Sequence, residues 1–444
     1  MLKLPIALKA FAEALEREGV KLYAVGGCVR DAQLLRAVHD VDLASRARPD
    51  ELLERAKAFG IEAKIVQQTL GTVLLTIDGV DYEHTTFRTE SYGAGGAHKP
   101  DAVRFADLPE QDAFRRDFSV NALYERVADG SILDPTGGQK DLENRVLRTT
   151  TKDPAVILRD DGLRILRLVR FAASLDFTVD PGTWEAAKAN AALLKDVAWE
   201  RKRQELDRIL LGPRVCNALT MLRDVGALPY LLPELTACDG MAQRTDYHRY
   251  DVLTHLFHTC ENTPEELGIR LIGLLHDVGK PEALKRDGRL YAHDVYGAET
   301  ARTMLVRLRY PNALIDRVCG AIRIHMFDLT DSASEATLRK RFAAFGRERT
   351  EDLIMIREAD VRGSGIRTDF TAERWREIYR KMREERAPFS ERELAVSGAD
   401  IMRELGLPAG ERVGKIKHAL LLRCAVHPEE NERKTLLKRM HDYR

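Results

Sequence analysis

The chain has 444 residues, of which 44% are apolar and 32% are charged. This length is enough for two to four domains, and the composition suits a soluble, largely helical protein. Lysine plus arginine and aspartate plus glutamate both number 70, so the net charge gives no evidence of a nucleic-acid partner. Any RNA-binding surface has to arise from local segregation of charge.

The beginning of the chain predicts an amphipathic helix. Residues 1–19 lack the uninterrupted apolar core of a signal peptide, and no run of 18 apolar residues occurs, so no membrane span is expected. The six cysteines form no CxxC pair. They are typical of small core residues in a reducing compartment, not of a disulfide or zinc framework. These features together predict a cytoplasmic protein.

The most informative pattern is a predicted strand, a glycine turn and a predicted helix in succession. The apolar run at 22–25 predicts the strand, Gly26 and Gly27 form the turn, and the helix is expected over residues 29–37. Two glycines let the backbone approach a ligand closely, and the start of a helix offers free N–H groups to phosphate oxygens. The pattern therefore predicts a phosphate-binding turn.

Three carboxylates predict a divalent-metal centre near this turn. Asp40 and Asp42 flank a valine on a predicted short strand, whose periodicity points both side chains to one face. Glu83 adds a third carboxylate, as two-metal phosphoryl transfer with Mg²⁺ often requires. Arg30 would place a cation beside the phosphates or would simply orient Asp31. A glycine pair or a DxD alone usually marks a turn or a solvated strand end, but their order and spacing together favour nucleotidyl transfer.

Strand signals are concentrated in the first third of the chain. A DG turn at 78–79 predicts a hairpin between residues 72–77 and 80–87. From about residue 150 onward, apolar residues recur at helical spacing instead. The expected fold class is α+β, with a small mixed β-sheet and helices in a head followed by three all-α parts. The expected boundaries are 1–148 for the head, 149–212 for a neck, 213–385 for a body and 386–444 for a tail.

Five motifs follow one another between residues 26 and 206. They are GGCVRD at 26–31 with DVDL at 40–43, RRDFSVNA at 115–122, DPTGGQKD at 134–141, DDGLRILRLVRF at 160–171, and ERKRQEL at 200–206. In this order they resemble the bacterial tRNA nucleotidyltransferases, the class shared by CCA-adding enzymes and poly(A) polymerases. The resemblance implies attack of an RNA 3′-hydroxyl on the α-phosphate of a nucleoside triphosphate, with Mg²⁺ held by Asp40 and Asp42.

The second motif is expected to position the incoming nucleotide. The resemblance extends this binding role to six residues, namely Arg115, Arg116, Asp117, Asn121, Arg167 and Arg170. An aspartate at position 117 is chemically suited to accept a hydrogen bond from a ribose 2′-hydroxyl. The alternative for 115–122 is a basic helix start followed by a core helix, with the arginines paired to Glu110 and Asp112 on a surface.

Asp161 and Arg164 of the fourth motif are expected to choose the base. At positions i and i+3 they would lie on one helix face, where a surface ion pair is the plainer interpretation. A carboxylate acceptor beside a guanidinium donor complements the edges of cytosine and adenine and mismatches guanine and uracil, at about 1–3 kcal/mol per unmet buried group. In the resembling enzymes this pair acts as a protein template. Here Asp160 replaces the more usual glutamate.

Residues 90–100 depart most from the family pattern. The family often shows a tyrosine, an aspartate and an Arg-His-Pro here, whereas this chain keeps Tyr92 and Pro100 but has Ala97-His98-Lys99. In the resembling enzymes a loop in this region helps to switch specificity from C to A. The departure leaves open whether the whole CCA or only part of it is added.

A second metal site is expected in the helical body, where six of the twelve histidines lie between residues 248 and 325. Four residues follow the ligand order of the HD phosphohydrolase family, and two more would complete a second ion: His255, His276, Asp277 and Asp360, then His293 and His325. Imidazole ligands favour Ni²⁺, Co²⁺ or Mn²⁺ here. The resemblance implies 2′,3′-cyclic phosphodiesterase or phosphatase activity on damaged RNA ends. The alternative is a degenerate HD fold with merely packed or solvated histidines.

The expected function is that of a CCA tRNA nucleotidyltransferase. Such an enzyme adds and repairs the 3′-terminal CCA of tRNA from CTP and ATP without a nucleic-acid template, and the tail is expected to bind tRNA. A poly(A) polymerase and a partial, CC- or A-adding enzyme are the close alternatives. From another class, the chain would be an HD phosphohydrolase with a nucleotide-sensing head, against which Asp40, Asp42 and the Asp161/Arg164 pair argue.

Overall fold

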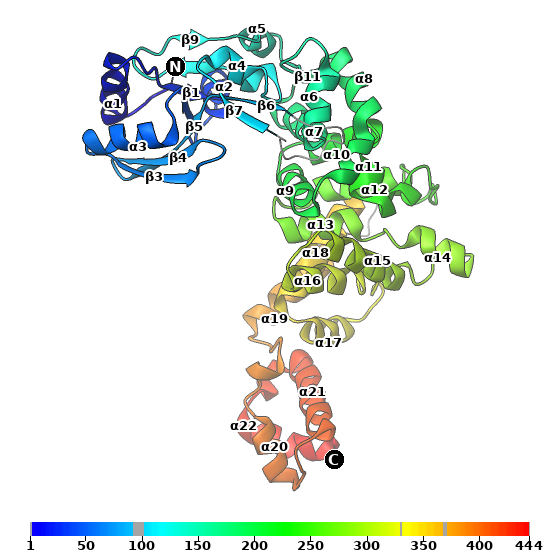
Figure 1. Ribbon diagram of the computed structural model, residues 1–444. Coiled ribbons are helices and arrows are strands. Elements are labelled where there is room, and N and C mark those ends of the chain that lie inside the picture. The colour runs from blue at the N-terminus through cyan, green and yellow to red at the C-terminus, as the bar shows by residue number, and fades with distance from the viewer. Residues whose placement is uncertain (1, 92–101, 329–330, 367–370, 444) are drawn as a thin grey trace. The chain divides into compact units, whose positions relative to one another are not determined.

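The computed structural model describes residues 2–91, 102–328, 331–366 and 371–443. It divides into two compact units, Met1–Leu231 and Leu232–Arg444 (Figure 1). The first unit combines sheets with helices, and the second is helical in its described part. The α+β prediction is confirmed. Among the described residues, no helix is both long enough and apolar enough to cross a bilayer.

A seven-stranded mixed sheet organises the first unit, in the order β3-β4-β5-β2-β1-β8-β9. The strands are β1 (Tyr23–Val25), β2 (Leu43–Ser45), β3 (Glu62–Gln67), β4 (Thr72–Ile77), β5 (Val80–Thr86), β8 (Tyr124–Arg126) and β9 (Ile132–Leu133). Strands β2 and β5 are parallel, and the other neighbours in this sheet are antiparallel. The predicted hairpin is confirmed, because β4 pairs with β5 across Asp78 and Gly79, both at positive φ.

Two helices near the start of the chain pack in the first unit. Helix α1 (Ile6–Arg17) confirms the predicted amphipathic helix, because Leu8, Phe11 and Leu15 recur at helical spacing and are buried. Helix α3 (Pro49–Ala58) packs on β3 and β4 (Figure 1). These contacts bury one side of the hairpin half of the sheet.

An aromatic cluster fills the core beside the centre of the sheet. The rings of Tyr23, Phe87 and Tyr124 contact one another, with centroids 6.0 to 6.1 Å apart. Phe87 leads into a separate two-stranded sheet of β6 (Arg88–Ser91) and β7 (Ala102–Phe105). Because the hydroxyl of Tyr124 reaches the second motif, this cluster also supports the site described below.

The rest of the first unit is mainly helical. Its helices are α2 (Gly27–Gln33), α4 (Pro109–Ala113), α5 (Gly138–Glu143), α6 (Pro154–Asp160), α7 (Leu163–Leu175), α8 (Pro181–Asn190), α9 (Trp199–Leu210), α10 (Val215–Asp224) and α11 (Leu228–Leu231). The short parallel pair of β10 (Val146–Leu147) and β11 (Thr178–Val179) ties the start of this region to the end of α7. Helix α7 packs against α9 and α10.

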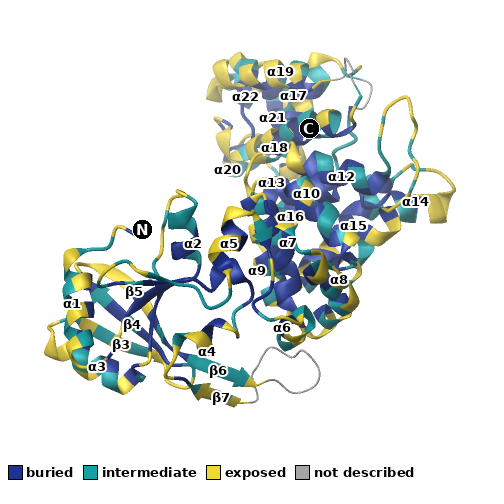
Figure 2. Ribbon diagram, turned by 90° about the horizontal axis from the view of Figure 1, so that it is seen from above, coloured by how far each residue is buried: buried dark blue, intermediate teal, exposed yellow. Residues whose placement is uncertain are grey.

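The second unit contains α12 (Val252–Glu261), α13 (Leu267–Leu275), α14 (Lys280–Asp287), α15 (His293–Arg307), α16 (Asn312–Ile322), α17 (Glu335–Phe345), α18 (Arg347–Gly363), α19 (Glu373–Glu384), α20 (Gly398–Leu405), α21 (Glu411–Val426) and α22 (Arg433–Arg439). Helices α12 and α13 are largely buried and contact α18 (Figure 2). Helices on both sides of residue 386 share one core around Trp375, Phe342 and Leu420.

Candidate functional site

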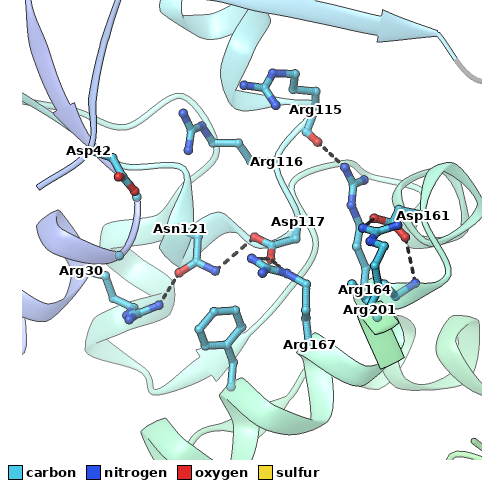
Figure 3. Close-up of a pocket in the computed structure, with 14 residues that line it drawn as sticks. Arg30, Asp42, Arg115, Arg116, Asp117, Asn121, Asp161, Arg164, Arg167 and Arg201 are labelled. Carbon is cyan, nitrogen blue, oxygen red and sulfur yellow. Dashed lines mark hydrogen bonds and ion pairs between the residues drawn. The ribbon is translucent and has the colours of Figure 1, made fainter. Parts of the chain in front are cut away.

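A charged cavity of about 380 Å³ lies in the first unit (Figure 3). Its lining residues are Gly26, Gly27, Arg30, Asp42, Arg115, Arg116, Asp117, Asn121, Asp161, Leu163, Arg164, Arg167, Phe171 and Arg201. The lining includes six arginines but three aspartates, and this positive excess suits a polyanion such as a triphosphate. Most of the predicted site residues therefore meet in one cavity. Asp40, Glu83 and Arg170 are not part of its lining.

The glycine turn of the first motif leads directly into a helix. Gly26 has φ of 84°, a conformation that favours glycine, and it precedes α2. Helix α2 begins two residues earlier than predicted and ends at Gln33, so the prediction of a helix over 29–37 is wrong at both ends. The chain leaves the helix at Leu35, whose φ of 57° is incompatible with its continuation. Both glycines line the cavity beside the start of the helix.

The carboxylates of the predicted metal centre lie on the segment that leads into β2 and on the neighbouring strand β5. The prediction that Asp40 and Asp42 lie on a strand is wrong, because both precede β2, which begins at Leu43. The parallel pairing places Leu43 opposite His84, so the residues before them, Asp42 and Glu83, are also neighbours. Parallel register thus brings Asp42 and Glu83 together.

The electrostatics of Asp42 fit a cation site. Asp42 is accessible from the cavity, yet the surrounding protein removes enough water to raise its pKa, and the Glu83 carboxylate raises that pKa further. Arg116 opposes the shift and Asp40 adds a smaller increase. Three carboxylates that repel one another offer the hard oxygen ligands preferred by Mg²⁺.

The two arginines of the second motif are anchored by a buried aspartate. Asp112 is 1% exposed and accepts hydrogen bonds from Arg115 at 2.8 Å, from Arg116 at 2.9 Å and from the Tyr124 hydroxyl at 2.7 Å. Burial alone would raise the pKa of Asp112, but the two guanidinium groups hold it well below its ordinary range. The alternative of a surface pairing and a core helix is wrong, because Asp112 is buried and a 3₁₀ turn at 119–121 replaces the helix.

A chain of hydrogen bonds crosses the floor of the cavity. Arg30 donates to Asn121 Oδ1 at 2.6 Å, Asn121 donates to Asp117 Oδ1 at 3.1 Å, and Arg167 Nε donates to Asp117 Oδ2 at 2.7 Å (Figure 3). Although burial alone would raise it, Arg167 and Asn121 hold the pKa of Asp117 at about 2. Arg30 also pairs with Asp31. Asp117 therefore orients the groups around it while remaining ionised.

Residues of the third motif pack against the second motif and form hydrogen bonds with it. Asp134 accepts hydrogen bonds from the backbone N–H groups that begin α5, and Asp141 accepts one from the Ser119 hydroxyl at 2.6 Å. A Cβ at Gly138 would lie 2.2 Å from the carbonyl oxygen of Ser119. Glycine is required here because α5 begins directly against the turn that carries Asn121.

Asp161 and Arg164 both face the cavity, but they do not share a helix face. Asp161 lies between α6 and α7 in an extended conformation, and Arg164 lies in the first turn of α7, so this prediction is wrong. Arg164 donates to the carbonyl oxygens of Ile157 at 2.9 Å and Arg115 at 2.8 Å. The gap between α6 and α7 thus gives each side chain its own direction toward the cavity (Figure 3).

The fifth motif supplies a lining residue to which sequence analysis assigned no role. Arg201 on α9 donates to Asp161 Oδ2 at 2.7 Å. Glu205, one turn later, is 2% exposed and accepts from Arg170 at 2.7 Å. Arg170 in turn stacks on Phe171, 4.0 Å from the ring centroid. The position of Arg201 within the fifth motif was the signal that could have assigned it to the site. Its pairing with Asp161 depends on the packing of α9 against α7.

The segment that departs from the family pattern lies mostly outside the described residues. Tyr92, Pro100 and Ala97-His98-Lys99 all fall there. Glu90, at the described edge, accepts a hydrogen bond from Arg88 at 2.6 Å.

A cluster of histidines and aspartates lies in the second unit. His255 Nε2 is 3.3 Å from His276 Nε2 and 3.1 Å from Asp360 Oδ1, and His276 Nε2 is 3.3 Å from Asp277 Oδ2. Helices α12 and α18 carry the first and the last of these residues, and the pair follows the end of α13. Four separated positions are thereby gathered around one point, as ligands of one metal ion would be.

Asp277 also faces a second group of donors. Its Oδ1 is 3.0 Å from His293 Nε2 and 3.7 Å from His325 Nε2. The Nδ1 atoms of these histidines lie 2.8 and 2.7 Å from backbone carbonyl oxygens, which accept their protons. In the neutral rings Nε2 then presents a lone pair toward a carboxylate, an arrangement that a cation between them stabilises.

The charges of this cluster fit a divalent ion. Burial would lower the pKa of His276, yet Asp277 and Asp360 raise it to about 10. The Nε2 atoms of His293 and His325 are buried without a hydrogen-bond partner. Imidazole and carboxylate donors together suit Mn²⁺, Co²⁺ or Ni²⁺, so the residues present fit the metal that the HD resemblance implies.

A close helix contact holds the second group of donors in place. A Cβ at Gly279 would lie 2.1 Å from the carbonyl oxygen of His293 and 2.3 Å from the backbone nitrogen of Gly297. Glycine in the HDVGK segment therefore lets α15 approach the metal ligands. A cavity of about 420 Å³ beside the cluster is also lined by His248 and Lys280, which sequence analysis did not assign to the site.

Comparison with known families divides the chain into three matches. Residues 22–148 match the poly A polymerase head domain, residues 176–239 match the probable RNA and SrmB-binding site of polymerase A, and residues 245–362 match the HD domain. The first match contains the carboxylates and the second motif, and the last contains the histidine cluster.

Individual proteins are similar along nearly the whole chain. A CCA-adding enzyme of Geobacillus sp. (strain WCH70) is 32% identical over 97% of this chain and 94% of the relative. An A-adding tRNA nucleotidyltransferase of Deinococcus radiodurans is 37% identical over 89% of each. Among solved structures, the Bacillus stearothermophilus CCA-adding enzyme in complex with CTP has a TM-score of 0.72 at 26% identity, covering 99% of this chain and 98% of that chain.

Proposed function

Because the chain belongs to the family of bacterial CCA-adding tRNA nucleotidyltransferases with an HD domain, we propose that the cavity of its first unit adds C and A to the 3′ end of tRNA from CTP and ATP. The observation that carries the proposal is the convergence of Asp42, Asp117, Asp161 and Arg164 on one positively charged cavity. This set offers separate means of holding metal, orienting the nucleotide and testing its base.

Asp40, Asp42 and Glu83 would hold Mg²⁺ at one end of the cavity. When bound, Mg²⁺ activates the attacking 3′-hydroxyl and neutralises the triphosphate. Arg116, which lies close enough to lower the pKa of Asp42, and Arg115 are fixed by Asp112 and present cations to the phosphates. Preorganised cations of this kind stabilise charge in the transition state without having to reorient.

Base choice would depend on Asp161 and Arg164. The carboxylate accepts from the exocyclic amino group of cytosine or adenine, and the guanidinium donates to the adjacent ring nitrogen. Uracil and guanine would instead oppose acceptor to acceptor and donor to donor, which costs about 1–3 kcal/mol for each unmet buried group. Since Arg201 and two backbone carbonyl groups hold this pair, its polarity is set before the nucleotide enters.

Partial addition is a second candidate, and a specific observation favours it. The Deinococcus radiodurans relative, at 37% identity, is named as an A-adding enzyme, whereas the Geobacillus relative at 32% is named as a CCA-adding enzyme. The two activities share the same chemistry and differ in which tRNA end is accepted. The poly(A) alternative differs from both because it would repeat ATP addition.

The experiment uses the full chain with tRNA ending before the CCA, after one C and after both C residues. Each substrate is incubated with CTP, ATP, UTP or GTP alone and with CTP plus ATP, and the products are resolved to single nucleotides. We expect CTP alone to add two residues and ATP to add one only after CC. Addition of ATP to the CC end alone would establish the A-adding alternative, and long adenine tracts would establish the poly(A) polymerase.

We further propose that the histidine cluster of the second unit is a metal-dependent phosphohydrolase site for 2′,3′-cyclic phosphate or phosphate ends of RNA. The supporting observation is that Asp277 directs one oxygen to His276 and the other to His293. Protein stripped with chelator and then supplied with Ni²⁺, Co²⁺, Mn²⁺ or Mg²⁺ should hydrolyse 2′,3′-cyclic AMP with the first three ions. If no ion is retained and none supports hydrolysis, this second function is wrong.

A further inference from the structure

Lys280 places a positive charge against the histidine cluster. Its Nζ is 2.5 Å from Asp277 Oδ2 and donates a hydrogen bond to Gln243 Oε1 at 2.6 Å. Lys280 is only 7% exposed, and it lines the cavity of about 420 Å³ beside the cluster. A buried ammonium group therefore forms part of the wall of this cavity.

The oxygen that faces Lys280 also faces the metal-binding imidazoles. Asp277 Oδ2 is 3.3 Å from His276 Nε2 and 3.6 Å from His255 Nε2. A divalent ion ligated by this oxygen would lie within a few ångströms of the ammonium. Two cations at such a separation repel strongly inside a protein. Binding of the metal ion at Asp277 Oδ2 is therefore disfavoured while Lys280 contacts the same atom.

We propose that Lys280 competes with the divalent metal for Asp277 Oδ2 and, once the metal is bound, becomes the phosphate-binding cation of the cavity. The inference rests on the proposed phosphohydrolase function and names the group that recognises its substrate. A lysine ammonium is a compact charge on a flexible stem, with three donors. It can turn away from the carboxylate and still donate to Gln243 and to a phosphate oxygen.

Two further cations of the cavity lining suit the same ligand. Arg244 and Arg357 also line it, on the loop that holds Gln243 and on α18 respectively. Arg244 stacks on Tyr247, 5.0 Å from the ring centroid, which places an aromatic face beside a cation. The cavity thus offers cations to a phosphate and an aromatic ring to an attached nucleoside.

The first experiment measures binding of Mn²⁺ alone to the chelator-stripped full chain by calorimetry. Lys280→Gln should bind Mn²⁺ at least about tenfold more tightly than the wild type, because it removes the competing charge. Lys280→Arg should bind as the wild type does. Lys285→Gln, an exposed position on the same helix outside the cavity lining, is the matched control. Unchanged or weaker Mn²⁺ binding by Lys280→Gln would overturn the inference.

The second experiment measures binding of inorganic phosphate to the Mn²⁺-saturated proteins. Phosphate affinity should fall at least about tenfold in Lys280→Gln and stay unchanged in Lys285→Gln. Equal phosphate affinity in both variants would overturn the phosphate-binding role. Thermal unfolding of every variant checks that the second unit is folded. If the wild type binds none of Mn²⁺, Co²⁺ and Ni²⁺, the proposed phosphohydrolase function itself is wrong and the inference falls with it.

Discussion

Asp161 accepts a hydrogen bond from Arg201, 40 residues away in the sequence, while Arg164 donates to the backbone of residues 115 and 157. The two members of the predicted base-reading pair are thus each held by a partner of their own. Their orientation toward the cavity depends on the packing of α9 and on the second motif, and not on their spacing within one helix.

Arg201→Met should weaken base choice. Without the guanidinium, Asp161 loses the hydrogen bond to Oδ2 while the Leu163 N–H still donates to Oδ1. The carboxylate is then oriented less firmly, so we expect kcat/KM for CTP to fall about tenfold, equivalent to roughly 1.4 kcal/mol. Discrimination against UTP should fall as well. Single-nucleotide addition with each triphosphate tests this, with Arg203→Gln on the same helix as the control. Unaltered selectivity would show that Asp161 needs no support from α9.

Asp42→Asn should abolish nucleotide addition and leave tRNA affinity within about twofold. The carboxylate would hold metal for the chemistry, whereas RNA affinity arises mainly from phosphate contacts with basic residues. Addition assays over a range of Mg²⁺ concentrations and tRNA filter binding measure the two effects. Asp81→Asn, an exposed carboxylate on the same strand as Glu83, is the control. Parallel loss of tRNA binding would count against the assignment.

Asp117 should stabilise the first unit in a pH-dependent way. Its pKa is about 2 in the folded chain and 3.8 ordinarily, so its contribution of about 2 kcal/mol is present above pH 4 and is lost as the pH falls through 2. Asp117→Asn should therefore be destabilised at pH 5, and its stability should depend less on pH between 4 and 2. Urea unfolding at several pH values tests this. Asp107→Asn, on an exposed carboxylate, should follow the wild type.

Gly279→Ala should destabilise the second unit. The added methyl group would overlap backbone atoms of α15, which cannot move without displacing His293. Overpacking of this kind costs about 1–3 kcal/mol or more, and retention of Mn²⁺ should fall with it. Gly414→Ala has no heavy atom within 4 Å of the new Cβ in a helix and should stabilise by about 0.5–1 kcal/mol. Thermal unfolding measures both variants, and an unchanged melting temperature for Gly279→Ala would contradict the prediction.

Asp277→Ala should separate the two proposed activities. It removes the carboxylate that both groups of histidines face, so bound transition metal and hydrolysis of cyclic phosphates should be lost. CCA addition should persist, because every lining residue of the nucleotide cavity belongs to the first unit. Metal analysis and the addition assay on one preparation measure both. Loss of addition without loss of the fold would contradict the separation.

Local patterns in the sequence were sufficient for several elements. The DG turn predicted the β4–β5 hairpin because positive φ at two successive residues is a property of the turn itself. The period of apolar residues predicted α1 for the same local reason. The order of His255, His276, Asp277 and Asp360 along the chain predicted a group of metal ligands, and these side chains lie close together in the structure. The boundaries at 148, 212 and 385 stay predictions.

Other features depend on contacts between distant segments, and local rules do not contain them. Asp42 lies beside Glu83 because β2 and β5 pair in parallel register. The alternation predicted for Asp40 and Asp42 does not apply, because both residues precede β2. Arg201 and Lys280 gain their roles from the packing of their helices against other elements. The sequence by itself determined which chemical groups this protein has and in what order. Only the tertiary structure decided their partners, because side-chain neighbours are set by packing across the chain and not by spacing along it.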